Sequence, residues 1–410
     1  MKNTSYIDPA IATETASSLL ALDASPHSKP RVVIIYHFFA HYRQAIIRAL
    51  MASHSFEFHF AGALVDPDKS IKEAVVPENY FSHAPCRRIF AGLLFQRGLI
   101  RLSLRSDISA IVFLGDAHFV MTWVAAMIAR ILGKRVLFWT HGWKTQELGL
   151  KGLTRSLFYR LPHGLLLYGN RSKQIGMAQG FEAERLYVIY NSLDYQAQRN
   201  IRRRISNCEL ETLRKSLFRE STTPLVVCTA RLTAACQFTL LLDAMDKLRA
   251  EDHIVYALLI GDGPELSSLQ SLVRAKRLPV IFYGACYNEE QLARMIMAAN
   301  VTVSPGKVGL TAMHSLAYGT PVITHDNFDA QGPEYEAIIP GRTGDFFRYE
   351  DSADLARLVK LWTLKGDIRT DQEREACYEV IEKRYNPEAQ RKVIELALEG
   401  KPAGDGEELV

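Results

Sequence analysis

Residues 303–327 read VSPGKVGLTAMHSLAYGTPVITHDN, and this stretch decides the fold of the sequence around it. Residues 301–304 (VTVS), with two β-branched valines, predict a buried strand, a loop with two glycines follows, and residues 310–318 predict a helix. A second short strand is expected at residues 321–324. Strand, loop, helix and strand in this order are typical of a parallel α/β sheet.

The same alternation of strands and helices extends over the rest of the chain. Strands are expected at residues 31–36, 56–61, 110–114, 135–139, 164–168 and 186–190 in the first half, and at 225–229, 255–260 and 280–283 in the second. Helical patterns at residues 44–51 and 123–132 lie between the first strands. Residues 194–221 are polar and helical, and they separate the two series. The predicted fold class is therefore α/β, with two Rossmann-like, doubly wound parallel-sheet domains that face a cleft.

This pattern divides the chain into six segments. They are a mobile N-terminal tail (1–29), an N-terminal Rossmann-like domain (30–197), an interdomain segment (198–222), a C-terminal Rossmann-like domain (223–371), helices that return towards the first domain (372–398) and a tail (399–410). Ligands of such sheets bind at the carboxyl ends of the strands, so we expect the functional site in the cleft.

The composition excludes several classes of protein. The chain has 410 residues, 48% of them hydrophobic, and a formal net charge of +4, which rules out a disordered, collagen-like or disulfide-scaffold protein. The nearly balanced charge argues against a nucleic-acid binder. The six cysteines are scattered without metal-ligand spacing, which favours the reducing cytoplasm. No apolar stretch is long enough to cross a membrane, so we expect at most a peripheral association with the inner face of the plasma membrane.

The positions of the glycines separate two kinds of nucleotide-binding protein. A dinucleotide-binding domain has G-x-G-x-x-G after its first strand, and neither residues 36–43 (YHFFAHYR) nor residues 229–236 (TARLTAAC) contain it. A dehydrogenase is therefore disfavoured. The helix that begins near Leu310 suits a phosphate instead, because a helix N-terminus has free N–H groups and a partial positive charge. Gly309 lets a ligand approach the backbone, and Thr311 offers a hydroxyl.

With these motifs the chain resembles a family 4 glycosyltransferase of the GT-B fold, over residues 30–398. The matching positions are Gly-Asp-Gly-Pro at 261–264, Ser304-Pro305, Gly-Thr-Pro-Val at 319–322 and, at the end of the first domain, Asn191 and Asp194. The resemblance implies a nucleotide-sugar donor held by the second domain, with Gly261 in the donor site. It also implies a saccharide or lipid-linked acceptor held mostly by the first domain.

The same resemblance bears on the reaction. It implies transfer that retains the anomeric configuration and uses neither a metal nor another cofactor. The biological setting that it implies is bacterial polysaccharide or glycolipid biosynthesis. No nucleic acid is expected among the partners.

Three positions depart from the family pattern. Arg231 matches the family's diphosphate-binding arginine, but Cys236 replaces the lysine that usually follows it, and Gly306 and His314 replace the two glutamates of a Glu-x7-Glu motif. A departing diphosphate develops negative charge, so a lost cation must be replaced. We expect Lys307, beside the glycine loop, to replace it and to bind the diphosphate together with Arg231. His314 is expected to hydrogen-bond a ribose hydroxyl or the donor sugar.

In the first domain, candidate residues follow the ends of predicted strands. His141 ends the run LFWTH and resembles the family histidine that contacts the donor sugar or the acceptor oxygen. Asp116 ends IVFLGD and is either an acceptor-side carboxylate or a helix cap. Tyr42 and Arg43, in the loop HFFAHYR, are candidates for acceptor contact, and packing is the alternative for Tyr42.

Residues 86–106 contain five arginines and no acidic residue among many apolar side chains. Such a stretch can lie in the headgroup region of an anionic membrane. The alternative is an internal helix whose apolar face belongs to the core and whose arginines are solvated.

Two other functions share the expected fold. A nucleotide-sugar 2-epimerase would release a free epimerised sugar without an acceptor. A degenerate, non-catalytic scaffold is the other alternative, because Cys236, Gly306 and His314 replace three polar positions of the family.

Overall fold

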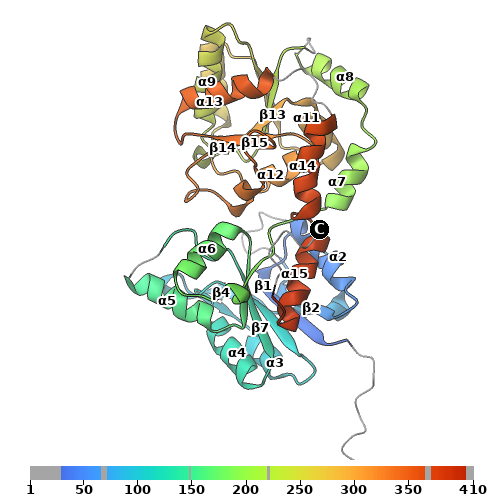
Figure 1. Cartoon of the computed structure of the whole chain (residues 1–410), viewed down its shortest axis with the longest axis vertical. Helices are drawn as coiled ribbons and strands as arrows, with labels where there is room; N and C mark the ends of the chain where they lie inside the picture. The colour runs from blue at the N-terminus through green and yellow to red at the C-terminus, as the bar shows by residue number, and fades with distance from the viewer. Residues whose placement is uncertain (1–28, 66–71, 147–148, 219–221, 365–370, 403–410) are drawn as a thin grey trace, which may run out of the picture.

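The computed structural model describes residues 29–65, 72–146, 149–218, 222–364 and 371–402. These residues form two α/β domains that follow one another along the long axis of the molecule (Figure 1). The expected fold class is confirmed, because each domain is built on a parallel sheet. Of the two expected tails, residues 1–28 and 403–410 lie outside the described part of the chain.

In the described part of the chain, the first sheet has seven parallel strands in the order β3-β2-β1-β6-β7-β8-β9. Their bounds are β1 Arg31–Phe38, β2 Glu57–Ala63, β3 Phe81–His83, β6 Ala110–Leu114, β7 Arg135–Thr140, β8 Gly164–Leu167 and β9 Leu186–Val188. β1 pairs with β2 on one edge and with β6 on the other. Its residues alternate between two cores: Val32 and Ile34 belong to one, Val33 and Ile35 to the other. This burial on both faces explains the continuous apolar run in the sequence.

Within the same described ranges, the second sheet has six parallel strands in the order β12-β11-β10-β13-β14-β15. They are β10 Leu225–Thr229, β11 Tyr256–Ile260, β12 Val280–Gly284, β13 Val301–Val303, β14 Val322–His325 and β15 Gly344–Phe347. The central strand β10 lies between β11 and β13. The carboxyl ends of these strands carry the loops with Arg231, Gly261 and Gly309.

Helices cover both faces of each sheet (Figure 1). The helices of the first domain are α2 Gln44–Met51, α3 Leu99–Leu104, α4 Val120–Ile131, α5 Gly149–Arg160 and α6 Asn170–Ala178. Those that follow are α7 Tyr195–Arg202, α8 Asn207–Phe218, α9 Phe238–Ala250, α10 Leu266–Lys276, α11 Glu289–Ala298, α12 Thr311–Ala317, α13 Ser352–Thr363, α14 Asp371–Lys383 and α15 Pro387–Glu399.

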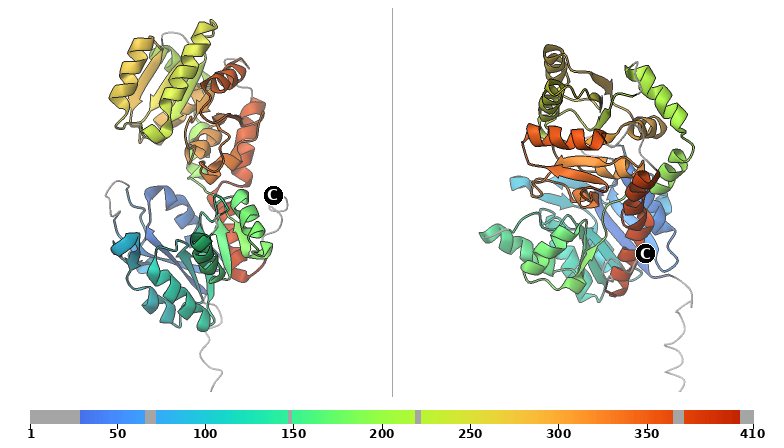
Figure 2. Two further views of the ribbon diagram at one scale, coloured as in Figure 1. Left: turned by 90° about the vertical axis from the view of Figure 1, so that its left-hand side faces the viewer. Right: turned by 45° about the horizontal axis from the view of Figure 1, so that its top comes forward.

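The chain crosses between the domains twice. It first passes from β9 into α7, whose Tyr195 packs in one core cluster with Ala312 of α12. The expected boundary between residues 197 and 198 therefore falls inside a helix that packs on the second domain. The second crossing leads from α14 to α15, the last two helices of the described chain (Figure 2). Ile394 of α15 belongs to the first-domain core. Arg135 of β7 donates to the carbonyl oxygen of Ala397 at 2.8 Å and fixes this helix.

The basic stretch 86–106 is not one amphipathic helix, so the expectation of an internal helix is wrong for most of it. It folds as an antiparallel hairpin of β4 (Cys86–Arg88) and β5 (Leu94–Gln96), followed by the short helix α3. Buried Gln96 donates to the carbonyl oxygens of Tyr36 and Ala84, and this pairing fixes the hairpin on the sheet. Polar anchoring of this kind has no periodic signal in the sequence.

The sequence pattern also does not predict two further strands, β3 and β15. Each lies at an edge of its sheet and is short, and their sequences FSH and GDFF lack a β-branched run. No helix in the described ranges is both long and apolar enough to span a bilayer.

Candidate active site

A cavity of about 790 Å³ opens at the carboxyl ends of the central strands of the second sheet. Its size is in the range of small-molecule sites. The cavity is lined by Thr229, Ala230, Arg231, Ile260, Gly261, Asp262, Gly263, Pro264, Ala285, Cys286, Tyr287, Leu292, Leu310, Thr311 and His314. Five of the residues predicted to bind the donor thus share one cavity, although they come from three separate segments of the chain: Arg231, Gly261, Leu310, Thr311 and His314.

Close backbone packing shapes the floor of this cavity. Gly261 has a φ of +150°, and a Cβ there would lie 1.9 Å from the carbonyl oxygen of Ala230. Gly263 packs in the same way on Leu232. These glycines therefore bring the loop after β11 against the loop after β10, where side chains would hold the two apart. Gly309 differs, because it has a φ of +51° and open space where a Cβ would lie.

The loop that carries Cys236 packs closely against Gly306. A Cβ on Gly306 would lie 2.2 Å from the carbonyl oxygen of Ala235 and 2.9 Å from the Cα of Cys236. The backbone N–H of Gly306 donates to the carbonyl oxygen of Cys236 at 3.1 Å. The loop that carries Cys236 therefore fills the space that a side chain at position 306 would need, while the Cys236 thiol turns inward to the carbonyl oxygen of Arg231 at 3.1 Å.

Arg231 and Lys307 are both exposed, and neither side chain forms an ion pair with another described residue. In particular, no acidic side chain of the following helix α9 pairs with Arg231 within the described ranges. Arg231 lines the cavity, whereas Lys307 lies on the side of the glycine loop that faces the first domain. The hydroxyl of Thr311 is already engaged, since it donates to the carbonyl oxygen of Thr229 at 2.7 Å.

His314 lies against a carboxylate that sequence reasoning missed. Its Nε2 is 3.4 Å from Oε1 of Glu289, the first residue of α11. The same oxygen accepts from the Tyr318 hydroxyl at 2.6 Å and from Nε2 of Gln198 at 3.1 Å. Burial alone would raise the pKa of Glu289, but these hydrogen bonds and His314 outweigh it and lower the pKa to about 2. Gln198 belongs to α7, so this cluster also joins the donor cavity to the interdomain crossing.

His141 follows β7 and lies near enough to the second domain for the charge of Lys307 to act on it. Its ring packs on Tyr168 with centroids 4.8 Å apart. Desolvation in the cleft lowers the pKa of His141 to about 4, and the positive charges of Lys144, Lys307 and Arg43 act in the same direction. Lys307 belongs to the second domain, so both domains contribute charge at this point. At neutral pH His141 is an uncharged imidazole that can donate one hydrogen bond and accept another.

Tyr42 and Arg43, the predicted acceptor residues, have different environments. Tyr42 is 37% exposed. Arg43 instead donates to the hydroxyls of Tyr36 at 3.0 Å and of Tyr168 at 2.7 Å, and its guanidinium lies over the Tyr36 ring. Arg43 therefore orients Tyr168, which in turn packs on His141, and its hydrogen bonds are directed into the protein.

Asp116 stays in its own loop. Its Oδ1 accepts from the backbone N–H of His118 at 3.0 Å and lies 2.7 Å from the Nδ1 of that residue. The N-cap of α4 is Phe119, so Asp116 does not cap this helix. The described contacts do not join Asp116 to His141.

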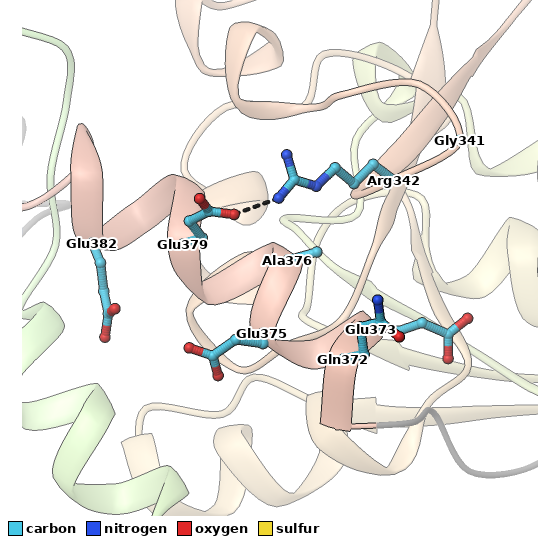
Figure 3. Close-up of a pocket in the computed structure, with 8 residues that line it drawn as sticks. All are labelled: Gly341, Arg342, Gln372, Glu373, Glu375, Ala376, Glu379 and Glu382. Atoms are coloured by element: carbon cyan, nitrogen blue, oxygen red, sulfur yellow. Dashed lines mark hydrogen bonds and ion pairs between the residues drawn. The ribbon is translucent and has the colours of Figure 1, made fainter. Parts of the chain in front are cut away.

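A second cavity, of about 590 Å³, lies along α14 and is unsuited to an anionic ligand (Figure 3). Four carboxylates line it, those of Glu373, Glu375, Glu379 and Glu382, and the guanidinium of Arg342 is paired with Glu379. A diphosphate would be repelled there. The described residues contain no cluster of three or more metal-ligating side chains.

Residues 210–401 match the family described as "Glycosyl transferases group 1". The match spans the second domain and the two C-terminal helices. The match covers β10 to β15, and therefore all five predicted donor residues that line the cavity. No curated protein sequence matches the chain.

Three solved structures, each aligned over about nine tenths of this chain, show that it has the GT-B fold. A glycosyltransferase from Rickettsia africae aligns with a TM-score of 0.67 and 13% identity, over 91% of this chain and 99% of its own. The apo form of the lipopolysaccharide outer core galactosyltransferase WaaB gives 0.63 and 14%, over 90% and 99%. Alr3699/HepE from Anabaena, solved with UDP and glucose, gives 0.59 and 17%, over 91% and 100%.

Proposed function

We propose that this protein is a glycosyltransferase that moves a sugar from a nucleotide-sugar donor to an acceptor hydroxyl. The observation that carries the proposal is the cavity in the group 1 domain, where Arg231, Thr311 and His314 meet at the carboxyl ends of the strands. Two of its structural neighbours were solved with UDP and a sugar, which supports a nucleotide-sugar as the ligand.

The cavity suggests how the donor is oriented. Tyr287 is 95% exposed on its wall and offers a flat surface for the base. His314, which Glu289 holds, would hydrogen-bond the ribose hydroxyls. The diphosphate would then lie between Arg231 in the cavity and Lys307 at its rim towards the first domain. The sugar would project past Lys307 into the cleft.

Charge stabilisation is the main task of the chain in this reaction. When the bond from the sugar to the diphosphate breaks, negative charge grows on the departing oxygen, and fixed cations nearby lower the barrier. Arg231 and Lys307 supply that charge, and Lys144 of the first domain adds to it when the cleft is closed. Because these cations can take the place of a metal ion, we propose a metal-independent reaction. We also propose retention of configuration, on the resemblance to the family.

The acceptor would bind at the carboxyl edge of the first sheet. His141 is neutral there at pH 7, so it positions the donor sugar or the acceptor oxygen by hydrogen bonds. Tyr42, exposed at the same edge, is the proposed acceptor contact. We propose a saccharide or lipid-linked acceptor in bacterial polysaccharide or glycolipid synthesis on the cytoplasmic side of the membrane.

The test begins with a thermal-shift panel of UDP, GDP, ADP and CMP on the full chain. A shift with one nucleotide is expected, and the corresponding nucleotide-sugars are then incubated with the protein without acceptor. Slow hydrolysis to free sugar of the same configuration supports a transferase. Release of the epimeric sugar would identify a 2-epimerase instead. No shift with any nucleotide would overturn the proposal and favour a non-catalytic scaffold.

A further inference from the structure

Glu334 is a buried carboxylate at the junction of the two domains. It lies in the 3-10 helix η6 (Pro333–Ala337), which follows β14, and only 5% of the residue is exposed. Oε1 accepts from Nδ2 of Asn191 at 3.0 Å, where the chain crosses from the first domain. Within the described residues, the carboxylate accepts this one hydrogen bond. An ionised carboxylate has about four acceptor positions. A buried charge with unused acceptor capacity favours a ligand that donates hydrogen bonds.

Two lysines flank this carboxylate, one from each domain. Oε2 of Glu334 and Cε of Lys307 lie 2.5 and 3.1 Å from the point where a Cβ on Gly332 would sit. Lys144 of the first domain is also close enough to interact with the charge of Glu334. Burial and Lys307 lower the pKa of Lys144, and Glu334 acts in the opposite direction. Glu334 therefore faces the part of the cleft where His141 and Lys307 approach each other.

The donor cavity is directly beside this point. The Cα of Gly309 lies 3.7 Å from the same Cβ position on Gly332, and the next two residues, Leu310 and Thr311, line the cavity. The position of Glu334 relative to the glycine loop is fixed by Gln331, whose Oε1 accepts from the backbone N–H of Val308 at 2.9 Å. Gln331 is buried and also donates to the hydroxyl of Thr324 at 2.8 Å.

The chemistry of a nucleotide-sugar donor determines which of its groups can bind a carboxylate. The diphosphate is anionic and is repelled by Glu334, whereas sugar hydroxyls donate hydrogen bonds that are stronger to a charged acceptor. The glycine loop itself offers no carboxylate, because its sequence is SPGKVGLT and position 306 is filled by the loop of Cys236. A sugar attached beyond Lys307 would reach Glu334 before it reached the first domain.

We propose that Glu334 binds hydroxyl groups of the donor sugar and so selects which sugar the protein accepts. The proposal rests on the proposed function, since it concerns the sugar end of the same donor. It makes Glu334 a specificity-determining residue that the family motif does not mark.

The test compares a nucleotide with its sugar conjugates in wild type and in Glu334→Gln. The glutamine keeps the shape and can still accept from Asn191, but it loses the charge. The probes are the nucleoside diphosphate that shifts the wild type and its glucose, galactose, mannose and N-acetylglucosamine conjugates, measured by calorimetry. We expect affinity for the free diphosphate to stay within about twofold, while affinity for the preferred conjugate falls about tenfold or more and the preference among sugars narrows.

Glu336→Gln is the matched control. It removes another carboxylate of the same short helix, and that carboxylate contacts the first domain and not Lys307. Its sugar preference is expected to match the wild type. An unchanged sugar preference in Glu334→Gln would overturn the proposal, and so would an equal loss for the diphosphate and its conjugates. Failure of the wild type to bind any nucleotide would instead overturn the proposed function itself.

Discussion

Gly169 of the first domain makes room for the carboxylate of Glu336 in the second domain. A Cβ on Gly169 would lie 2.5 Å from Oε1 of Glu336. The carboxylate accepts from the backbone N–H groups of Asn170 at 2.7 Å and Arg171 at 2.9 Å, the first two residues of α6. An acidic group at a helix N-terminus is stabilising, and here it joins the two domains.

Gly169→Ala should loosen this junction. Gly169 has an extended φ of −166°, so alanine adds no backbone strain and acts through the contact alone. Displacing the carboxylate from α6 is expected to cost about 1–3 kcal/mol of unfolding free energy, measured by urea denaturation. In a Glu336→Ala background the same substitution should cost much less. Equal costs in both backgrounds would show that the two residues are not coupled.

Arg231→Gln and Lys307→Gln should each lower kcat/KM for the donor by about 100-fold, because each removes a cation from the departing diphosphate. Steady-state kinetics with the identified nucleotide-sugar measures the effect. Lys215→Gln, an exposed lysine on α8, is the control and should behave like the wild type. Unchanged turnover and donor affinity in Lys307→Gln would exclude a role for Lys307 in binding the diphosphate.

Glu289→Gln should weaken donor binding through His314. The variant keeps the hydrogen-bonding shape but loses the charge that holds the imidazole, and we expect donor KM to rise about fivefold, as for a lost hydrogen bond. His314→Ala should raise KM by a similar factor. The double variant should be no worse than His314→Ala, since the two residues act in series. Additive effects would mean that Glu289 acts on the donor independently of His314.

His141 should not titrate in the physiological range. Its pKa is about 4 in the folded protein, below the usual 6.5. Between these values the unfolded chain binds a proton that the folded chain does not, so this group's contribution to stability is present above pH 6.5 and is lost as the pH falls towards 4. The profile of kcat/KM against pH reports the free enzyme. We expect His141 to cause no inflection near pH 6.5, so the wild-type and His141→Gln profiles should have the same shape in this range.

If the chain binds an anionic membrane, we expect the hairpin of β4 and β5 to make the contact. Phe90 in its loop is 78% exposed, and Arg87 and Arg88 on β4 are exposed beside it. Wild type should float with vesicles of phosphatidylcholine and phosphatidylglycerol. The double variant Arg87→Gln, Arg88→Gln should lower the vesicle partition coefficient roughly 30-fold, since each basic residue near the surface adds about 1 kcal/mol. Arg105→Gln should float normally, because Asp107 already binds that guanidinium at 2.6 Å. If wild type stays unbound, the hairpin is not a membrane contact.

The meeting of several candidate residues in one cavity was largely predictable. Arg231, Gly261, Thr311 and His314 each follow a buried strand, and parallel strands end at a common edge, so local patterns were enough to bring them together. Glu289 could not be found in this way, because it begins a helix and reaches His314 only through packing between α11 and α12. The first-domain candidate Arg43 was assigned to the acceptor, but the hydroxyls of Tyr36 and Tyr168 engage it.

By itself, the sequence determined that the chain has two parallel α/β sheets and which loops end at their carboxyl edges. Those properties follow from apolar periodicity and glycine conformation, which act between near neighbours in the chain. Only the tertiary structure decided that Lys144, Lys307 and Glu334 face one another, that Gly306 has lost its space to the loop of Cys236, and that Glu336 holds α6. These contacts join segments of separate domains or loops, and their energies depend on burial and charge that arise only when the domains dock.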